Sequence, residues 1–162
     1  GEEAYSLAIL LAEEGLLDRA MIYATDINPR ALRIAESGVY ELDRIARFST
    51  AYTAAGGTGS LSDYYTATGD GARFDRRLRQ AIVFSDHSLA TDSVFAECQL
   101  VSCRNVLIYF ERELQERALD VLTDALGHRG FLGLGSKETL RFSRHAARYA
   151  EVDAAARIYQ KR

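Results

Sequence analysis

The chain has 162 residues, of which 48% are hydrophobic and 27% are charged, and its formal net charge is −3. A chain of this length and apolar content is expected to fold as one globular domain. The composition excludes a disordered or repetitive protein. The acidic balance excludes a general electrostatic attraction to nucleic acid or to anionic lipid, so we expect no nucleic-acid partner.

The cysteines and histidines indicate the cellular compartment of the protein and whether it binds a metal. The sequence has two cysteines, Cys98 and Cys103, and its three histidines lack the spacing of a metal site. No apolar run reaches the length of a membrane span, and no signal-like segment precedes the first helix. These features predict a cytoplasmic protein with reduced thiols, no bound metal and no insertion into a membrane.

In chain order, the N-terminal part predicts a helix, a strand and a second helix. Residues 4–14 carry apolar side chains at helical spacing and stop at Gly15, and residues 20–25 form a short apolar strand that ends at Asp26. Asn28-Pro29 supplies an N-cap and a first-turn proline for a helix that ends at Ser37-Gly38. Glycines and tyrosines then interrupt the pattern, and we expect a small inserted subdomain at about residues 46–80.

The C-terminal part predicts further strands around one long helix. The strands are expected at 81–85, 99–103, 131–135, 149–152 and 157–160, the last two as an antiparallel hairpin, with an amphipathic helix at 111–126 that Gly127 ends. Alternating strands and helices predict an α/β, Rossmann-like fold, in which a mostly parallel sheet gains a C-terminal antiparallel strand.

Ligands of such sheets bind beyond the carboxyl ends of the strands, which directs attention to Asp26, to residues 86–89 and to Arg104-Asn105. Asp26 is placed either to accept hydrogen bonds from ribose hydroxyls or to interact favourably, as a carboxylate, with the dipole of the next helix. Glu3 is either a ligand contact at a glycine-bearing turn or an ordinary acidic residue of a first helical turn. Arg73, Arg76 and Arg77 form either a docking patch for an acidic partner or a solvated face.

Four motifs give the sequence a family resemblance. They are GEEAYSLA at 1–8, ATDINPRAL at 24–32 with A-x-S-G-x-Y at 35–40, CRNVLIYF at 103–110 running into Gln115-Glu116-Arg117, and G-F-L-G-L-G-S at 130–136. In this order they resemble the CheR family of chemotaxis-receptor methyltransferases. The resemblance implies a class I methyltransferase sheet, S-adenosylmethionine as cofactor and S-adenosylhomocysteine as product. It also implies transfer of a methyl group to glutamates on the cytoplasmic helices of methyl-accepting chemotaxis receptors, by an enzyme that acts as a monomer.

The resemblance also assigns roles to residues. Glu3 and Asp26 would hold polar groups of the cofactor, Arg104 and Asn105 would line the next strand end, and Tyr109 would face the reacting sulfonium. Ser88-Leu89 stands where the family has Asn-Leu, with Leu89 available to pack on adenine, and Gly135-Ser136-Lys137-Glu138 stands where it has Gly-His-Ser-Glu. Receptor contact is expected at Arg73, Arg76 and Arg77, which lie in the interval of the family's inserted β-subdomain.

Gly1 reads as a cut edge, because the family has a helical domain and a first strand before the GEE motif. We therefore expect a fragment whose sheet lacks its first strand and which has little methyltransferase activity by itself.

Two other functions remain open. A nicotinamide-dependent oxidoreductase would use Asp26 but needs a G-x-G-x-x-G turn, which Gly1-Glu2-Glu3-Ala4 does not supply. A noncatalytic module that senses S-adenosylmethionine, or scaffolds a larger signalling protein, would keep the same motifs.

Overall fold

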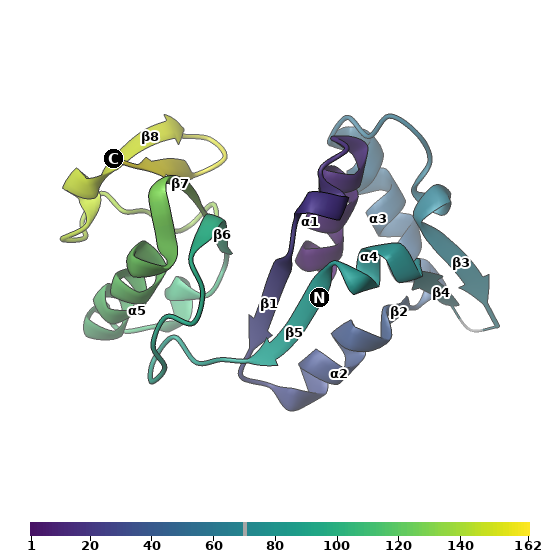
Figure 1. The fold of residues 1–162 in the computed structure, drawn as a ribbon, viewed down its shortest axis with the longest axis horizontal. Helices are drawn as coiled ribbons and strands as arrows, with labels where there is room; N and C mark the ends of the chain where they lie inside the picture. The colour runs from purple at the N-terminus through teal and green to yellow at the C-terminus, as the bar shows by residue number, and fades with distance from the viewer. Residues whose placement is uncertain (70) are drawn as a thin grey trace. The chain divides into compact units, whose positions relative to one another are not determined.

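The computed structural model describes residues 1–69 and 71–162. The chain divides into two compact units, Gly1–His87 and Ser88–Arg162 (Figure 1). The helices and strands of the first unit are α1 (Glu2–Glu13), β1 (Ile22–Asp26), α2 (Pro29–Ser37), β2 (Val39–Tyr40), α3 (Leu42–Ala54), β3 (Tyr65–Thr68), β4 (Gly71–Phe74), α4 (Arg76–Gln80) and β5 (Ile82–Asp86). Those of the second unit are β6 (Cys98–Cys103), α5 (Arg112–Ala125), β7 (Leu126–Leu134), β8 (Tyr149–Asp153) and β9 (Ile158–Lys161), with short 3₁₀ turns between them.

Strand pairing confirms the predicted α/β class. In the first unit β1 and β5 pair in parallel, with Asp26 opposite Asp86 at their carboxyl ends. In the second unit β6 and β7 pair in parallel, and β9 lies antiparallel to both β7 and β8, as expected for the C-terminal hairpin. Within its own unit, as far as the structure describes it, β1 pairs with β5 and β6 pairs with β7.

The segment expected to be an insertion contains most of helix α3, which begins before it at Leu42, and part of a small antiparallel sheet. The sheet has the strand order β2-β4-β3, so Val39–Tyr40 joins it from outside the predicted interval. The start of α2 follows the predicted capping, since the Asn28 side chain accepts hydrogen bonds from the backbone N–H groups of Arg30 and Ala31. Gly38 ends α2 at φ 65°, a left-handed conformation that glycine adopts without strain.

An aromatic cluster forms the centre of the first unit. The Tyr5 ring is 1% exposed, stacks on Phe74 at a centroid distance of 4.7 Å, and meets Tyr40 edge-on at 6.0 Å. The two tyrosine hydroxyls differ. That of Tyr5 donates to the carbonyl oxygen of Ala35 at 2.8 Å, whereas that of Tyr40 is buried and has no hydrogen-bond partner in the described part of the chain.

Phenylalanine substitutions should show how much each of these two hydroxyls contributes to the stability of the protein. Tyr5→Phe removes one of two hydrogen bonds that the Ala35 carbonyl oxygen accepts, the other coming from the Gly38 N–H at 3.1 Å, and should lower the free energy of unfolding by about 0.5–1.5 kcal/mol, while Tyr40→Phe should be close to neutral. Urea unfolding at pH 7 measures both values. Burial raises the pKa of Tyr5 to about 12, so its contribution is complete below pH 10 and is lost as the pH rises toward 12. Equal losses in the two variants would contradict this assignment.

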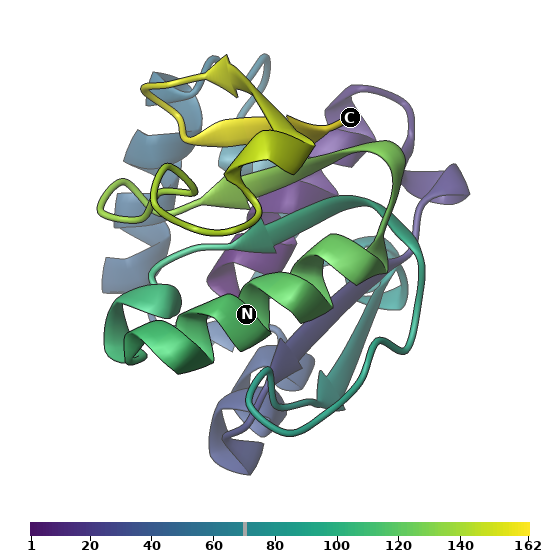
Figure 2. The ribbon, with the colours of Figure 1, turned by 90° about the vertical axis from the view of Figure 1, so that its left-hand side faces the viewer.

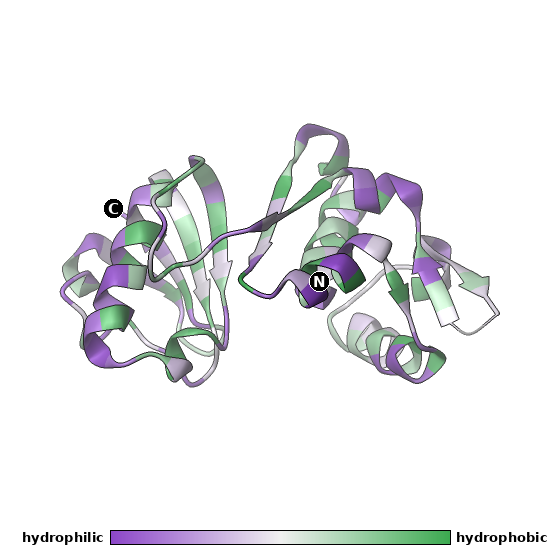
Figure 3. Cartoon of the chain, turned by 90° about the horizontal axis from the view of Figure 1, so that it is seen from below, coloured by the Kyte–Doolittle hydropathy of each residue, from purple (hydrophilic) through white to green (hydrophobic). Residues whose placement is uncertain are grey.

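The core of the second unit lies between α5 and the strands. α5 packs against β6 and β7, with Ala118 and Leu122 of the helix buried, as are Leu132 and Leu134 of β7 (Figure 2). Hydrophobic and hydrophilic residues alternate along the helices and strands of each unit (Figure 3).

The expected end of this helix at Gly127 is wrong. α5 ends at Ala125, and the buried Leu126 already begins β7 in extended conformation. Gly127 is the second residue of β7, and its φ is not positive, so it does not adopt the left-handed conformation of a helix cap.

Candidate functional site

Two of the predicted site residues lie near the first residue of the chain, in the first unit. Asp26 ends β1, is exposed, and its Oδ1 accepts a hydrogen bond of 2.8 Å from the backbone N–H of Asn28. Glu3 lies exposed in the first turn of α1. The carboxylates of Glu2, Asp26 and Glu3 all lie close enough to the Gly1 nitrogen to interact with it electrostatically. Glu3 and Asp26 are therefore both near Gly1, at the carboxyl end of β1.

In the second unit the CRNVLIYF segment follows β6 directly. Arg104 and Asn105 are exposed, and Asn105 has a φ of 60°, a left-handed conformation that only a few per cent of non-glycine residues adopt. A 3₁₀ turn over Leu107–Tyr109 comes next. It buries Leu107 and leaves the Tyr109 side chain 80% exposed. The segment thus exposes the side chains of Arg104, Asn105 and Tyr109 at a strand end, while the buried Leu107 side chain holds the turn against the core.

The Ser88-Leu89 pair begins a tight turn in the same unit. The Ser88 backbone N–H donates to the Asp92 carboxylate at 2.8 Å, and Leu89 packs against the hydrophobic core of this unit. The contact with that core covers part of the leucine side chain.

The N-terminal half of α5 holds both of these segments. The Gln115 side chain donates to the carbonyl oxygens of Leu107 and Phe110, each at 2.9 Å, and thereby closes the turn that carries Tyr109. Arg117 donates to the carbonyl oxygens of Ala90 and Thr91, at 2.5 and 3.2 Å. Residues 88–91 and 104–110 are therefore brought together at one end of α5, with side-chain donors of the helix satisfying their backbone carbonyls.

The three arginines of the predicted docking patch are all exposed, and they lie on β4 and α4 of the first unit. Arg77 approaches Asp18 at 3.4 Å, a pair with so much solvent around it that it contributes little to stability.

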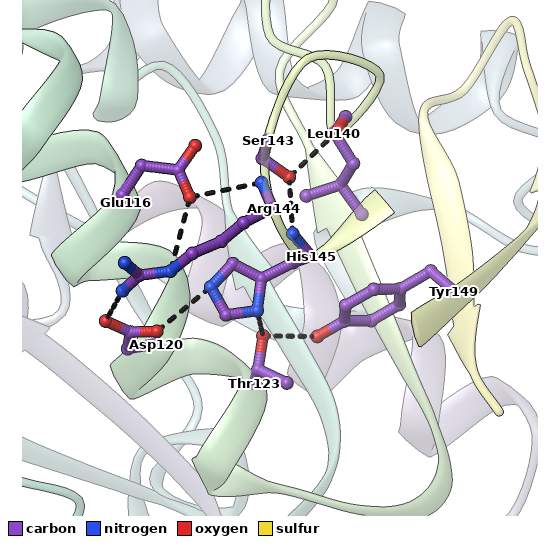
Figure 4. A network of polar contacts seen from close by, with 8 residues as sticks. All are labelled: Glu116, Asp120, Thr123, Leu140, Ser143, Arg144, His145 and Tyr149. Atoms are coloured by element: carbon purple, nitrogen blue, oxygen red, sulfur yellow. Dashed lines mark hydrogen bonds and ion pairs between the residues drawn. The ribbon is translucent and has the colours of Figure 1, made fainter. Parts of the chain in front are cut away.

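A second polar cluster contains the side-chain types of many catalytic sites, but it is buried (Figure 4). His145 is 3% exposed, and its Nε2 lies 3.0 Å from Asp120 Oδ1 while its Nδ1 lies 3.4 Å from the hydroxyl of Thr123. Tyr149 donates to the same hydroxyl at 2.9 Å, and Arg144 pairs with Asp120. Thr123 is fully buried, so no substrate reaches this hydroxyl. The cluster ties residues 143–149 to α5 and has a structural role.

The fold and the polar strand ends define a Rossmann-like α/β protein of the class I methyltransferase kind. The model of the family "CheR methyltransferase, SAM binding domain" matches residues 1–156, and the chain belongs to this family. S-adenosylmethionine is accordingly the cofactor of the domain.

Three relatives show how the domain occurs in other proteins. "Putative methyltransferase Cher3" of Pseudomonas putida is 53% identical over 99% of this chain, which spans 59% of that relative. "Chemotaxis protein methyltransferase 2" of Pseudomonas aeruginosa is 32% identical over 91% of the chain, 53% of the relative. An "Uncharacterized 104.1 kDa protein in hypE 3'region" of Rhodobacter capsulatus is 36% identical over 86% of the chain, which is 14% of that relative's length. The chain thus spans little more than half of the two named methyltransferases. No helix in the described ranges has the length and apolarity needed to cross a membrane.

Proposed function

We propose that this chain belongs to a protein-glutamate methyltransferase that modifies the cytoplasmic helices of methyl-accepting chemotaxis receptors. The observation that carries the proposal is the segment after β6, where Asn105 and the exposed Tyr109 are held at a strand end in a chain of the CheR family. The names of the relatives, several of which are chemotaxis protein methyltransferases, support the choice of pathway.

The chemistry requires positioning more than proton transfer. S-adenosylmethionine supplies an electrophilic methyl group bound to a positively charged sulfur. A glutamate side chain, with an ordinary pKa of about 4.3, attacks as a carboxylate at neutral pH, so no general base is needed. One C–O bond forms while the S–C bond breaks and its electron pair stays on sulfur, which gives a neutral ester and a neutral thioether. The work of the protein is to hold the two reactants in line and to exclude water.

The exposed polar groups of both units fit such a cofactor. Near Gly1, the carboxylates of Glu3 and Asp26 suit ammonium and hydroxyl groups. In the second unit Arg104 and Asn105 offer a cation and an amide, Ser88 and Leu89 a hydroxyl and an apolar surface, and Tyr109 an aromatic ring for the sulfonium. We propose that these residues bind the cofactor, with Tyr109 nearest to the transferred methyl group.

Receptor docking is proposed at the exposed arginines of β4 and α4. Arg73, Arg76 and Arg77 place three guanidinium groups within five residues, and receptor segments whose glutamates are the methyl acceptors carry the complementary charge.

The direct test uses the full-length protein with S-adenosylmethionine labelled in the methyl group and the cytoplasmic fragment of a chemotaxis receptor. We expect label on the receptor that mild base releases as methanol, as a carboxyl methyl ester requires, and we expect Tyr109→Ala to reduce the rate at least tenfold while cofactor affinity changes less. Label that resists base would contradict glutamate as the acceptor.

A second candidate function is a noncatalytic module that senses S-adenosylmethionine or scaffolds a larger signalling protein. The Rhodobacter capsulatus relative supports it, because the matched region makes up only 14% of that protein's length. Calorimetric titration with S-adenosylhomocysteine separates the two functions when it is combined with the transfer assay. Binding without transfer to any receptor fragment favours the sensor.

A further inference from the structure

Glu138 is a buried carboxylate that contacts the backbone of the CRNVLIYF segment. Its side chain is 4% exposed. Oε1 accepts hydrogen bonds from the backbone N–H groups of Val106, Leu107 and Ile108 at 2.9, 2.7 and 3.3 Å. Oε2 accepts from Asn105 at 3.0 Å and from Gly135 at 2.6 Å. One carboxylate therefore satisfies five backbone donors, four of them consecutive.

This arrangement stabilises both the buried carboxylate and the backbone N–H groups that bind it. A buried carboxylate is costly unless hydrogen bonds replace its hydration, and no lysine, arginine or histidine pairs with Glu138 in the described ranges. The amides after Asn105 open the 3₁₀ turn and would otherwise be orphan donors at a helical start. Successive N–H groups that converge on one anion form the concave site known as a nest, here occupied by a side chain of the same protein.

The carboxylate also fixes an unfavourable backbone conformation. Asn105 has a φ of 60°, which costs free energy in any residue other than glycine. Its N–H is bound to Oε2, and the next three N–H groups are bound to Oε1, so the left-handed residue and the following turn are set by one side chain. Asn105 and Tyr109 stand at the two ends of the turn that Glu138 defines.

We infer that Glu138 is a positioning residue for the cofactor site: it does not touch the cofactor but fixes the direction in which Asn105 and Tyr109 present their side chains. The inference rests on the proposed function, since it assigns to Glu138 the geometry of residues that are themselves proposed to bind S-adenosylmethionine.

The test compares Glu138→Gln with Glu151→Gln in the full-length protein. Glutamine has the same size, but it has one acceptor oxygen and an NH₂ group that must face two or more N–H donors. Glu151 lies exposed on β8 of the same unit and provides the matched control. The probe is S-adenosylhomocysteine in calorimetric titrations, and the second measurement is hydrogen exchange of the backbone amides.

We expect Glu138→Gln to raise the dissociation constant at least tenfold and to remove exchange protection from residues 104–109, while β8 and β9 stay protected. Glu151→Gln should match the wild type in both measurements. Wild-type affinity in Glu138→Gln, or protection lost evenly across the whole unit, would overturn the positioning role.

If Glu138→Gln does not fold, Glu138→Asp takes its place, since it keeps the charge and shortens the reach. A local loss of protection in that variant supports the inference, and a uniform loss refutes it. Failure of the wild-type protein to bind S-adenosylhomocysteine would overturn the proposed function instead, a result that the exchange pattern of the free protein does not depend on.

Discussion

Gly135→Ala should both destabilise the protein and weaken cofactor binding, although alanine is the smallest possible addition. A Cβ at this position would lie 2.7 Å from Glu138 Oε2, 2.8 Å from the backbone nitrogen of Asn105 and 3.1 Å from its Nδ2. The φ of Gly135 is not positive, so crowding rather than backbone strain excludes a side chain. Relief requires the buried carboxylate or the left-handed Asn105 to move.

We expect this overpacking to cost about 1–3 kcal/mol of unfolding free energy. The affinity for S-adenosylhomocysteine should fall at least tenfold in the full-length protein. Urea unfolding and calorimetric titration measure the two effects.

Gly133→Ala is the matched control, two residues earlier on the same strand. A Cβ there would meet only the Ser102 hydroxyl at 3.9 Å and the Val101 carbonyl oxygen at 4.0 Å, which are ordinary contacts. Its stability should equal or slightly exceed that of the wild type, because alanine reduces the entropy of the unfolded chain. Similar behaviour of the two alanine variants would mean that the contacts around Gly135 do not govern the site.

Asp26→Asn should produce the largest loss of cofactor affinity among single substitutions in the first unit. Asparagine keeps an Oδ1 that accepts the hydrogen bond from the Asn28 N–H, so the end of β1 is preserved. What disappears is the charge. A hydrogen bond to a charged group is worth about 1–1.5 kcal/mol more than one between neutral groups, so the removal of the charge from two hydrogen bonds with ribose hydroxyls should weaken binding roughly a hundredfold.

Calorimetric titration of the full-length protein with S-adenosylhomocysteine measures this change, with thermal unfolding as a check on the fold. Asp43→Asn removes the same charge from an exposed position in the first turn of α3 and should bind the cofactor normally. Unaltered affinity in Asp26→Asn would exclude Asp26 from the cofactor site.

The elements with regular patterns could be predicted from the sequence. The capping signals at Asn28-Pro29 and Gly38 locate α2 to the residue, and the apolar runs locate β5 and β6 within one residue and β1 within two. α3 was hidden because Ile45 is its only fully buried side chain, so it lacks a strong apolar face. The boundary between α5 and β7 cannot be predicted from Gly127, because a glycine is compatible with a helix cap and with a strand, and the helix passes directly into the strand at Leu126.

The side chains proposed for the site can be chosen from the sequence, whereas the residues that support them cannot. Asp26, Asn105 and Tyr109 follow strand ends, a position that has a physical meaning in α/β sheets. In the sequence Glu138 is only the last residue of a motif. Its partners are backbone N–H groups, which every residue except proline has, so the sequence does not indicate which residues bind it. The supporting role of Gln115 could not be predicted for the same reason, because both of its partners are backbone carbonyl oxygens.

The exposed apolar side chains of the strands have a practical consequence. Tyr23 of β1 is 42% exposed and Leu100 of β6 is 46% exposed, and an apolar side chain exposed on a strand favours the addition of an extended segment from another chain. Prepared by itself, the chain will tend to form intermolecular β-sheet as its concentration rises. Dilute samples and an early measurement of light scattering are therefore advisable before any binding result is interpreted.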